Sequence, residues 1–202
     1  MSVEPTSLQT SDTALRSAVL FVTLANLAYF GIEFAVALAI GSVALFADSI
    51  DFLEDTVLNL LILVGLSWST VWRGRLGMIL AALLLIPGLA TIQTAWEKFL
   101  HPTPPDPTWL AVAGAGALVI NLTCALVLTR YRKHRGSLAK AAFLSARNDA
   151  LANIAIVVAG LLTAVILSGW PDLIVGLGIL AMNADAARQV WIAARREVRT
   201  EK

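Results

Sequence analysis

Two groups of polar residues lie in otherwise apolar sequence, where together they could bind a cation. In the first group, Asp51, Asp55 and Asn59 recur every fourth residue, so on a helix they share one face. Asp48 extends that face by about one turn. Carboxylates that lie close together away from water repel one another unless protons or a cation neutralise them. A divalent ion with oxygen ligands would satisfy several of them at once.

The second group repeats the same spacing farther along the chain. Ser145, Asp149 and Asn153 are four residues apart, with Asn148 beside them. Counted from the basic segment before it, Asp149 lies roughly 14 Å along a helix, near the middle of a bilayer. Asp55 lies at a comparable depth. We therefore expect the two stripes to meet and to form a cation-translocation site.

Ionisable residues inside a membrane mark function, because each costs at least about 2.5 kcal/mol on insertion scales. The alternative is that Asp51, Asp55 and Asp149 only pair with one another or with Arg147 and lock the helices together. Three carboxylates on two stripes favour the cation site. Glu33, in an earlier apolar segment, has either a structural role or a place in an ion or proton path with Asp48, Asn59 and Asn153. Asn121 and Asn183 are expected to make hydrogen bonds between helices.

The composition is that of a membrane protein. The chain is 58% hydrophobic and 14% charged, against about 25% charged for soluble domains. No charge falls between Arg75 and Glu97 or between Asp106 and Arg130, and each interval suits a transmembrane helix of roughly 20 residues. A soluble helical core would need a polar outer face, and none is visible. The net charge of +1 gives no sign of a nucleic-acid partner.

Glycines, prolines and basic segments divide the chain into six helices. The predicted helices are 15–40, 43–67, 75–96, 108–130, 139–168 and 170–191. The fold class is therefore an all-α membrane protein, with a six-helix transmembrane bundle at residues 15–191.

Basic residues predict the orientation of the bundle. Thirteen of the fifteen fall on the side of the two termini; Lys98 lies on the opposite side, and Arg147 lies within a helix. Positive charge marks the cytoplasmic side, so we expect both termini there, in a plasma-membrane protein. Residues 1–14 are then an N-terminal cytoplasmic segment and 192–202 a short basic tail. The tryptophans agree, since all fall at helix ends, where they favour the membrane interface: Trp68, Trp72, Trp96, Trp109, Trp170 and Trp191.

Four segments resemble the cation diffusion facilitator family of six-helix divalent-metal exporters, and the resemblance covers nearly the whole chain. Residues 41–55, GSVALFADSIDFLED, look like its second-helix signature, and 145–153 are similar to its fifth-helix motif. Residues 170–177 and 101–105 resemble the start of its sixth helix and the loop after its third. The resemblance implies a tetrahedral metal site and alternating access driven by proton antiport. Carried over by position, the metal ligands are Asp51, Asp55, Ser145 and Asp149.

The chain departs from the family pattern at the fourth ligand. Ser145 stands where the family usually has His or Asp, and a neutral hydroxyl is a poor zinc ligand. Asn148 or water could replace it. An all-oxygen site suits manganese or magnesium, while zinc, cobalt, iron and cadmium stay open. The cytoplasmic domain through which most members dimerise is also missing, so a homodimer would have to form through the membrane helices.

These features predict a proton-coupled exporter of a divalent metal ion. Its partners would be the lipid bilayer, the metal and protons, with no prosthetic group. The alternatives are a metal-binding or regulatory membrane protein that does not transport, and an exporter of small organic cations. An enzyme is not expected, because neither stripe sits in the Gly-rich motif of an aspartyl protease.

Overall fold

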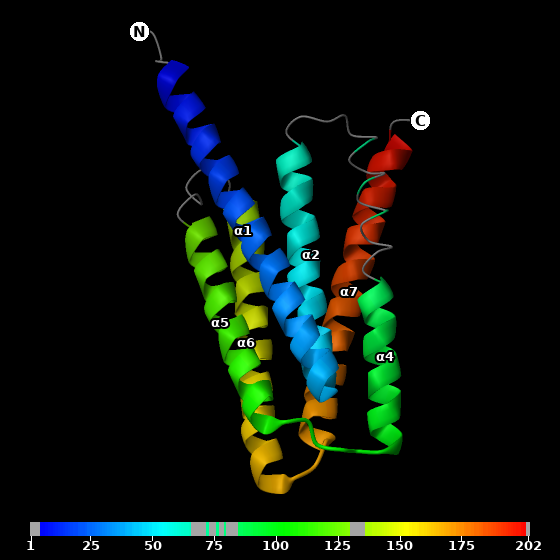
Figure 1. Ribbon diagram of the computed structural model, residues 1–202. Coiled ribbons are helices and arrows are strands. Elements are labelled where there is room, and N and C mark those ends of the chain that lie inside the picture. Colours follow the sequence, from blue (N-terminus) through cyan, green and yellow to red (C-terminus); the bar gives the residue numbers. More distant parts are fainter. Residues whose placement is uncertain are drawn as a thin grey trace.

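The chain folds into a bundle of long helices. The structure, a computed structural model, describes residues 5–65, 72, 76, 79, 85–129 and 136–200. Within these ranges the helices are α1 (Pro5–Ile40), α2 (Val43–Gly65), α4 (Leu85–Leu100), α5 (Pro107–Thr129), α6 (Gly136–Ile166) and α7 (Trp170–Thr200) (Figure 1). No strand occurs among the residues described. The prediction of an all-α fold with six helices is confirmed.

Three predicted helix ends were wrong. The first helix begins at Pro5 rather than near residue 15, and proline is well suited to a first helical turn. The last helix continues to Thr200 rather than ending near residue 191, because its Ala-, Arg- and Glu-rich sequence favours a helix in water as well. The third predicted helix ends at Leu100 rather than near residue 96, immediately before the proline-rich segment.

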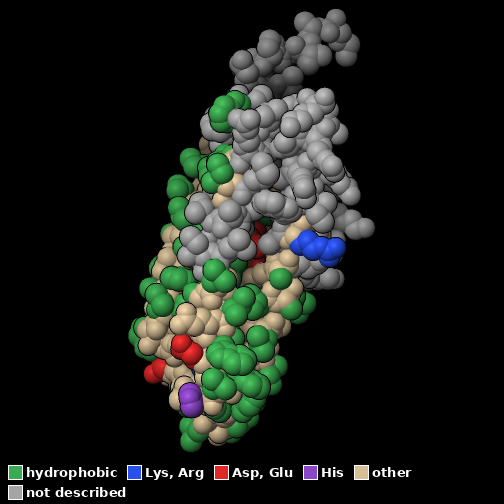
Figure 2. Space-filling model, turned by 90° about the vertical axis from the view of Figure 1, so that its right-hand side faces the viewer, with side chains coloured by type: hydrophobic (Ala, Val, Ile, Leu, Met, Phe, Trp, Pro, Cys, Tyr) green, Lys and Arg blue, Asp and Glu red, His purple; other side chains and the backbone are tan. Residues whose placement is uncertain are grey.

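The outer surface is apolar, as a membrane protein requires. Among the described residues, three helical stretches are long and apolar enough to cross a bilayer: Arg16–Ile40, Pro107–Thr129 and Asp149–Ile166. Side chains such as Leu126, Val165 and Ile174 are mostly exposed. Hydrophobic side chains cover much of the described surface in Figure 2. A soluble protein rarely exposes continuous apolar surface of this extent.

The two ends of the bundle differ (Figure 1). Both chain termini lie at one end, here called the terminal end. The α1–α2 turn and segments 101–106 and 167–169 lie at the other, the loop end. Gly41 forms the α1–α2 turn in a left-handed conformation (φ 63°), while Ser42 N donates to Ala37 O at 3.1 Å. This is a Schellman cap, for which glycine is the favoured residue.

Helix α2 packs against helices on two sides. On one side, α1 packs against both α2 and α5, and α5 packs against α6. Helix α7 packs against α2 and α6, and α4 packs against α2 and α7. The main apolar cluster, which includes Leu45, Leu110 and Ile156, joins α1, α2, α5, α6 and α7. The α4–α7 pair therefore flanks α2, the helix that carries Asp48, Asp51, Glu54 and Asp55.

Trp96, Trp109 and Trp170 are exposed in the terminal turns of α4, α5 and α7. All three lie at the loop end, and their position at a membrane interface stays a prediction.

Candidate functional site

Along the acidic face of α2, side chains are buried up to residue 50, and the acidic side chains from Asp51 onward are partly exposed. Every side chain from residue 42 to residue 50 is buried, and Asp48 is completely so. Asp51, Glu54 and Asp55, which follow toward the terminal end, are each partly exposed. In Figure 2, acidic side chains are visible in a recess of the bundle. The partly exposed carboxylates of α2 thus all lie on the terminal side of Asp48, and the buried residues 42–50 separate them from the loop end.

Asp51 lies where the acidic groups of two helices come together. It is within electrostatic range of Asp149 on α6, as well as of Asp48, Glu54 and Asp55 on its own helix. Helices α2 and α6 themselves contact each other at few points. The two polar stripes thus approach each other at the level of Asp51.

A complete ligand shell is not preformed among the side chains that are described. No group of three or more His, Cys, Asp or Glu is close enough there to hold a metal ion. Ser145 and Asn148 belong to α6, but their side chains lie outside the described part of the chain. Metal binding by Asp51, Asp55, Asp149 and these two residues stays a prediction.

Glu33 of α1 and Asp48 of α2 form a completely buried acidic pair. Their carboxyl groups are within electrostatic range of each other. If both are ionised, none of their four oxygens has a donor among the residues described. A buried charge without a partner is costly, so this pair has to hold a proton or face a cation.

Asn153 and Asn59 take different positions relative to this pair. Asn153 lies one helical turn from Asp149 toward the loop end. Asp48 lies about one turn from Asp51 in the same direction. The side chain of Asn153 is fully buried, and neither its oxygen nor its nitrogen is paired in the described structure. Asn59 instead donates to Asp55 O of its own helix at 2.7 Å. Of these two asparagines, Asn153 is the one whose side-chain polar atoms have no partner in the described chain.

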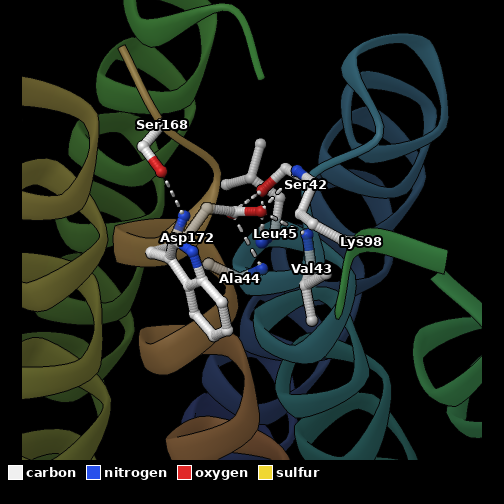
Figure 3. A network of polar contacts seen from close by, with 8 residues as sticks. Ser42, Val43, Ala44, Leu45, Lys98, Ser168 and Asp172 are labelled. Atoms are coloured by element: carbon white, nitrogen blue, oxygen red, sulfur yellow. Dashed lines mark hydrogen bonds and ion pairs between the residues drawn. The ribbon is translucent and has the colours of Figure 1, made fainter. Parts of the chain in front are cut away.

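Sequence reasoning missed a further buried carboxylate, Asp172 in the first turn of α7. It accepts from Ser42 Oγ at 2.6 Å, Val43 N at 2.9 Å and Ala44 N at 3.1 Å, and pairs with Lys98 Nζ at 2.8 Å (Figure 3). The available signals were a serine at a helix start and the only basic residue predicted for that side of the membrane. Neither indicated which acid would join them.

Comparison with known families gives one match. A family model described as the cation efflux transmembrane domain matches residues 76–197, more than half of the chain. The matched range includes Asp149, Asp172 and Lys98, whereas Asp51 and Asp55 precede it. No curated protein gives a significant match to the chain.

Proposed function

The chain belongs to the cation efflux transmembrane domain family, whose members transport cations, and on that premise we propose that it exports a divalent metal ion in exchange for protons. The ligands are Asp51 and Asp55 of α2 and Asp149 of α6, with Ser145, Asn148 or water as the fourth. The observation that carries the proposal is the meeting of acidic groups from two helices at Asp51. Carboxylates from separate helices suit a hard or borderline divalent ion.

The exposure of α2 supports one direction of access. The ion reaches Asp51 and Asp55 from the terminal end, where these side chains are partly exposed. It is stopped there by residues 42–50, all of them buried. The predominance of basic residues on the terminal side supports a cytoplasmic location for both termini. The described conformation is then the one that loads metal from the cytoplasm, and alternating access delivers it at the loop end.

The Glu33–Asp48 pair supports the proton half of the exchange. It is buried next to the proposed metal site, since Asp51 is within electrostatic range of Asp48. It has no hydrogen-bond donor in the described chain other than a proton of its own. A cation that moves from Asp51 toward the loop end meets this pair next and displaces its proton.

The test is metal flux into proteoliposomes that contain a metal-sensitive dye, with and without a pH gradient. Wild type is compared with Asp149→Asn and with Glu97→Gln, an exposed acid on α4 that serves as a matched control. We expect gradient-stimulated flux in wild type and in the Glu97 variant, and flux at the level of empty liposomes in the Asp149 variant. Screening zinc, cobalt, manganese, iron and cadmium identifies the cargo.

Two results would contradict the proposal. Equal flux in the wild type and the Asp149 variant would remove Asp149 from the site. Metal binding by the wild type without any flux would indicate a metal-binding protein that does not transport.

A further inference from the structure

One carboxylate joins three helices at the loop end. Asp172 of α7 receives two backbone N–H groups and one hydroxyl from the start of α2, and an ammonium group from α4 (Figure 3). Asp172 is completely buried and Lys98 is 5% exposed. Ser42 Oγ also accepts from Leu45 N at 3.1 Å, so the first turn of α2 is fully capped.

The physics of this contact is that of an anion at a helix N-terminus. The first N–H groups of a helix have no partner within the helix and carry a partial positive charge. A carboxylate there is stabilised, and Lys98 offsets the cost of burying it. The contact thus depends on charge as well as on shape.

The contact continues along α2 as a seam with α7. A Cβ atom on Gly176 would come within 2.6 Å of Val43 C and 2.7 Å of Ala44 N, so the two backbones touch. One further turn along, Asn183 Nδ2 donates to Ala47 O at 2.9 Å. The seam covers residues 42–47, directly between the loop end and the acidic residues of α2.

We propose that Asp172, held by Lys98, is a lock that keeps the loop end of the transport path closed, and that the cation leaves when α7 releases the N-terminus of α2. This rests on the proposed function, because it supplies the step that exposes Asp51 at the loop end. Lys98 and Asp172 are positioning residues that act on the site through α2.

The partition of the contacts explains why the lock can open. Lys98 and Asp172 both belong to the α4–α7 pair, and the ring of Phe99 on α4 meets Trp170 on α7 edge-on, with centroids 6.1 Å apart. These two helices can move together with their ion pair intact. Of the hydrogen bonds described, opening then breaks those from Asp172 and Asn183 to α2, whose donors and acceptors water can take over.

Cysteine accessibility tests the lock without relying on transport. Ser49 is buried, bonds to Phe46 O of its own helix, and lies two turns from Ser42 on the same face. Ser49→Cys, made in a Cys124→Ser background to remove the only native cysteine, is treated with a membrane-impermeant thiol reagent. Intact cells and inverted vesicles present the two sides of the membrane separately.

We expect slow labelling from the loop side with the lock intact. Asp172→Asn and Lys98→Met should speed it about tenfold or more, the effect of losing one charged hydrogen bond, and Lys98→Arg should restore slow labelling. Glu97→Gln, one residue from Lys98 and exposed, is the control and should change nothing. In flux assays the Lys98 variant should change the maximal rate while the metal KM stays within about twofold, since no ligand is altered.

The lock is overturned if folded Asp172→Asn or Lys98→Met protein labels from the loop side at the wild-type rate. It is also overturned if labelling rises only from the terminal side. Where Asp172→Asn does not fold, Ser42→Ala removes one bond to the same carboxylate and must still raise loop-side labelling. Faster loop-side labelling in a protein that moves no metal would retain the lock and reject the transport proposal.

Discussion

Two buried acidic regions of this bundle are built in opposite ways. At the loop end, Asp172 is surrounded by donors from α2 and α4. At mid-bundle, Glu33 and Asp48 are equally buried, yet none of their carboxyl oxygens has a hydrogen-bond donor among the residues described. Both regions place carboxyl groups away from water, where burial without a partner is costly. In the first region the chain itself supplies the partners.

The presence or absence of hydrogen-bond donors distinguishes structural carboxylates from those that can exchange ions. A carboxylate with four donors from its own chain needs nothing from outside, and it holds helices together. A pair of carboxylates without donors is complete only when a proton or cation joins it. This contrast indicates which acidic residues exchange ions and which ones hold the path around them.

The largest expected effect comes from Asp172→Ala. It leaves Lys98 buried without its partner and removes the acceptor of Val43 N and Ala44 N at the start of α2. Breaking a buried ion pair costs about 3–5 kcal/mol. The melting temperature in detergent micelles should fall steeply. The double variant Asp172→Ala, Lys98→Met removes the orphaned charge and should recover part of the loss. A single variant as stable as the wild type would show that this carboxylate is not structural.

A smaller loss is expected from Gly176→Ala. Its new methyl group would meet backbone atoms of α2 that cannot move aside, and overpacking of this kind costs about 1–3 kcal/mol. Gly178→Ala is the matched control two residues away, because nothing lies within 4 Å of its Cβ position. Thermal melts of the two variants should differ, with the Gly178 variant at or above wild type, since alanine favours helices. Equal melting temperatures would contradict the close α2–α7 seam.

The smallest expected change has the opposite sign. Glu33→Gln replaces one of two adjacent carboxyl groups with an amide that can donate to Asp48 without a bound proton. Stability should rise by about 1 kcal/mol, the worth of a satisfied hydrogen bond, while metal flux driven by a pH gradient falls. Melts and flux assays on the same preparation check both results. A loss of stability in the Glu33 variant would instead indicate that Glu33 has a structural role.

The sequence predicted more of the fold than of the contacts that hold it. Apolar length and charge placement indicated six helices, and the hydrogen bond from Asn183 to Ala47 O confirms that residue as an interhelical contact. The ends of α1 and α7 were missed because span length is set by the bilayer, whereas helix propensity continues beyond it. Helical spacing put the acids of α2 on one face.

The parts that could not be predicted depend on tertiary geometry. Asp172 and Ser42 are 130 residues apart in sequence, and no periodicity links them. Asn59 has the spacing of the acidic face, yet its amide bonds to its own helix, a local competition that position alone does not reveal. The separation of acidic residues into donor-rich and donor-free sets likewise appears only once the neighbours of each are in place.

The two-residue turn at Gly41 ties the start of α2 to the end of α1, so that α2 can tilt about this turn as a rigid helix. Asp51 lies nine residues from Ser42, roughly 14 Å along the helix. A tilt of α2 by about 10° about this turn would shift Asp51 by roughly 2 Å, close to the length of a metal–oxygen bond. The far end of α2, at Gly65, would travel more than twice as far. A rotation small enough to keep α2 packed against α1 at the turn is therefore large enough to separate Asp51 from a bound ion.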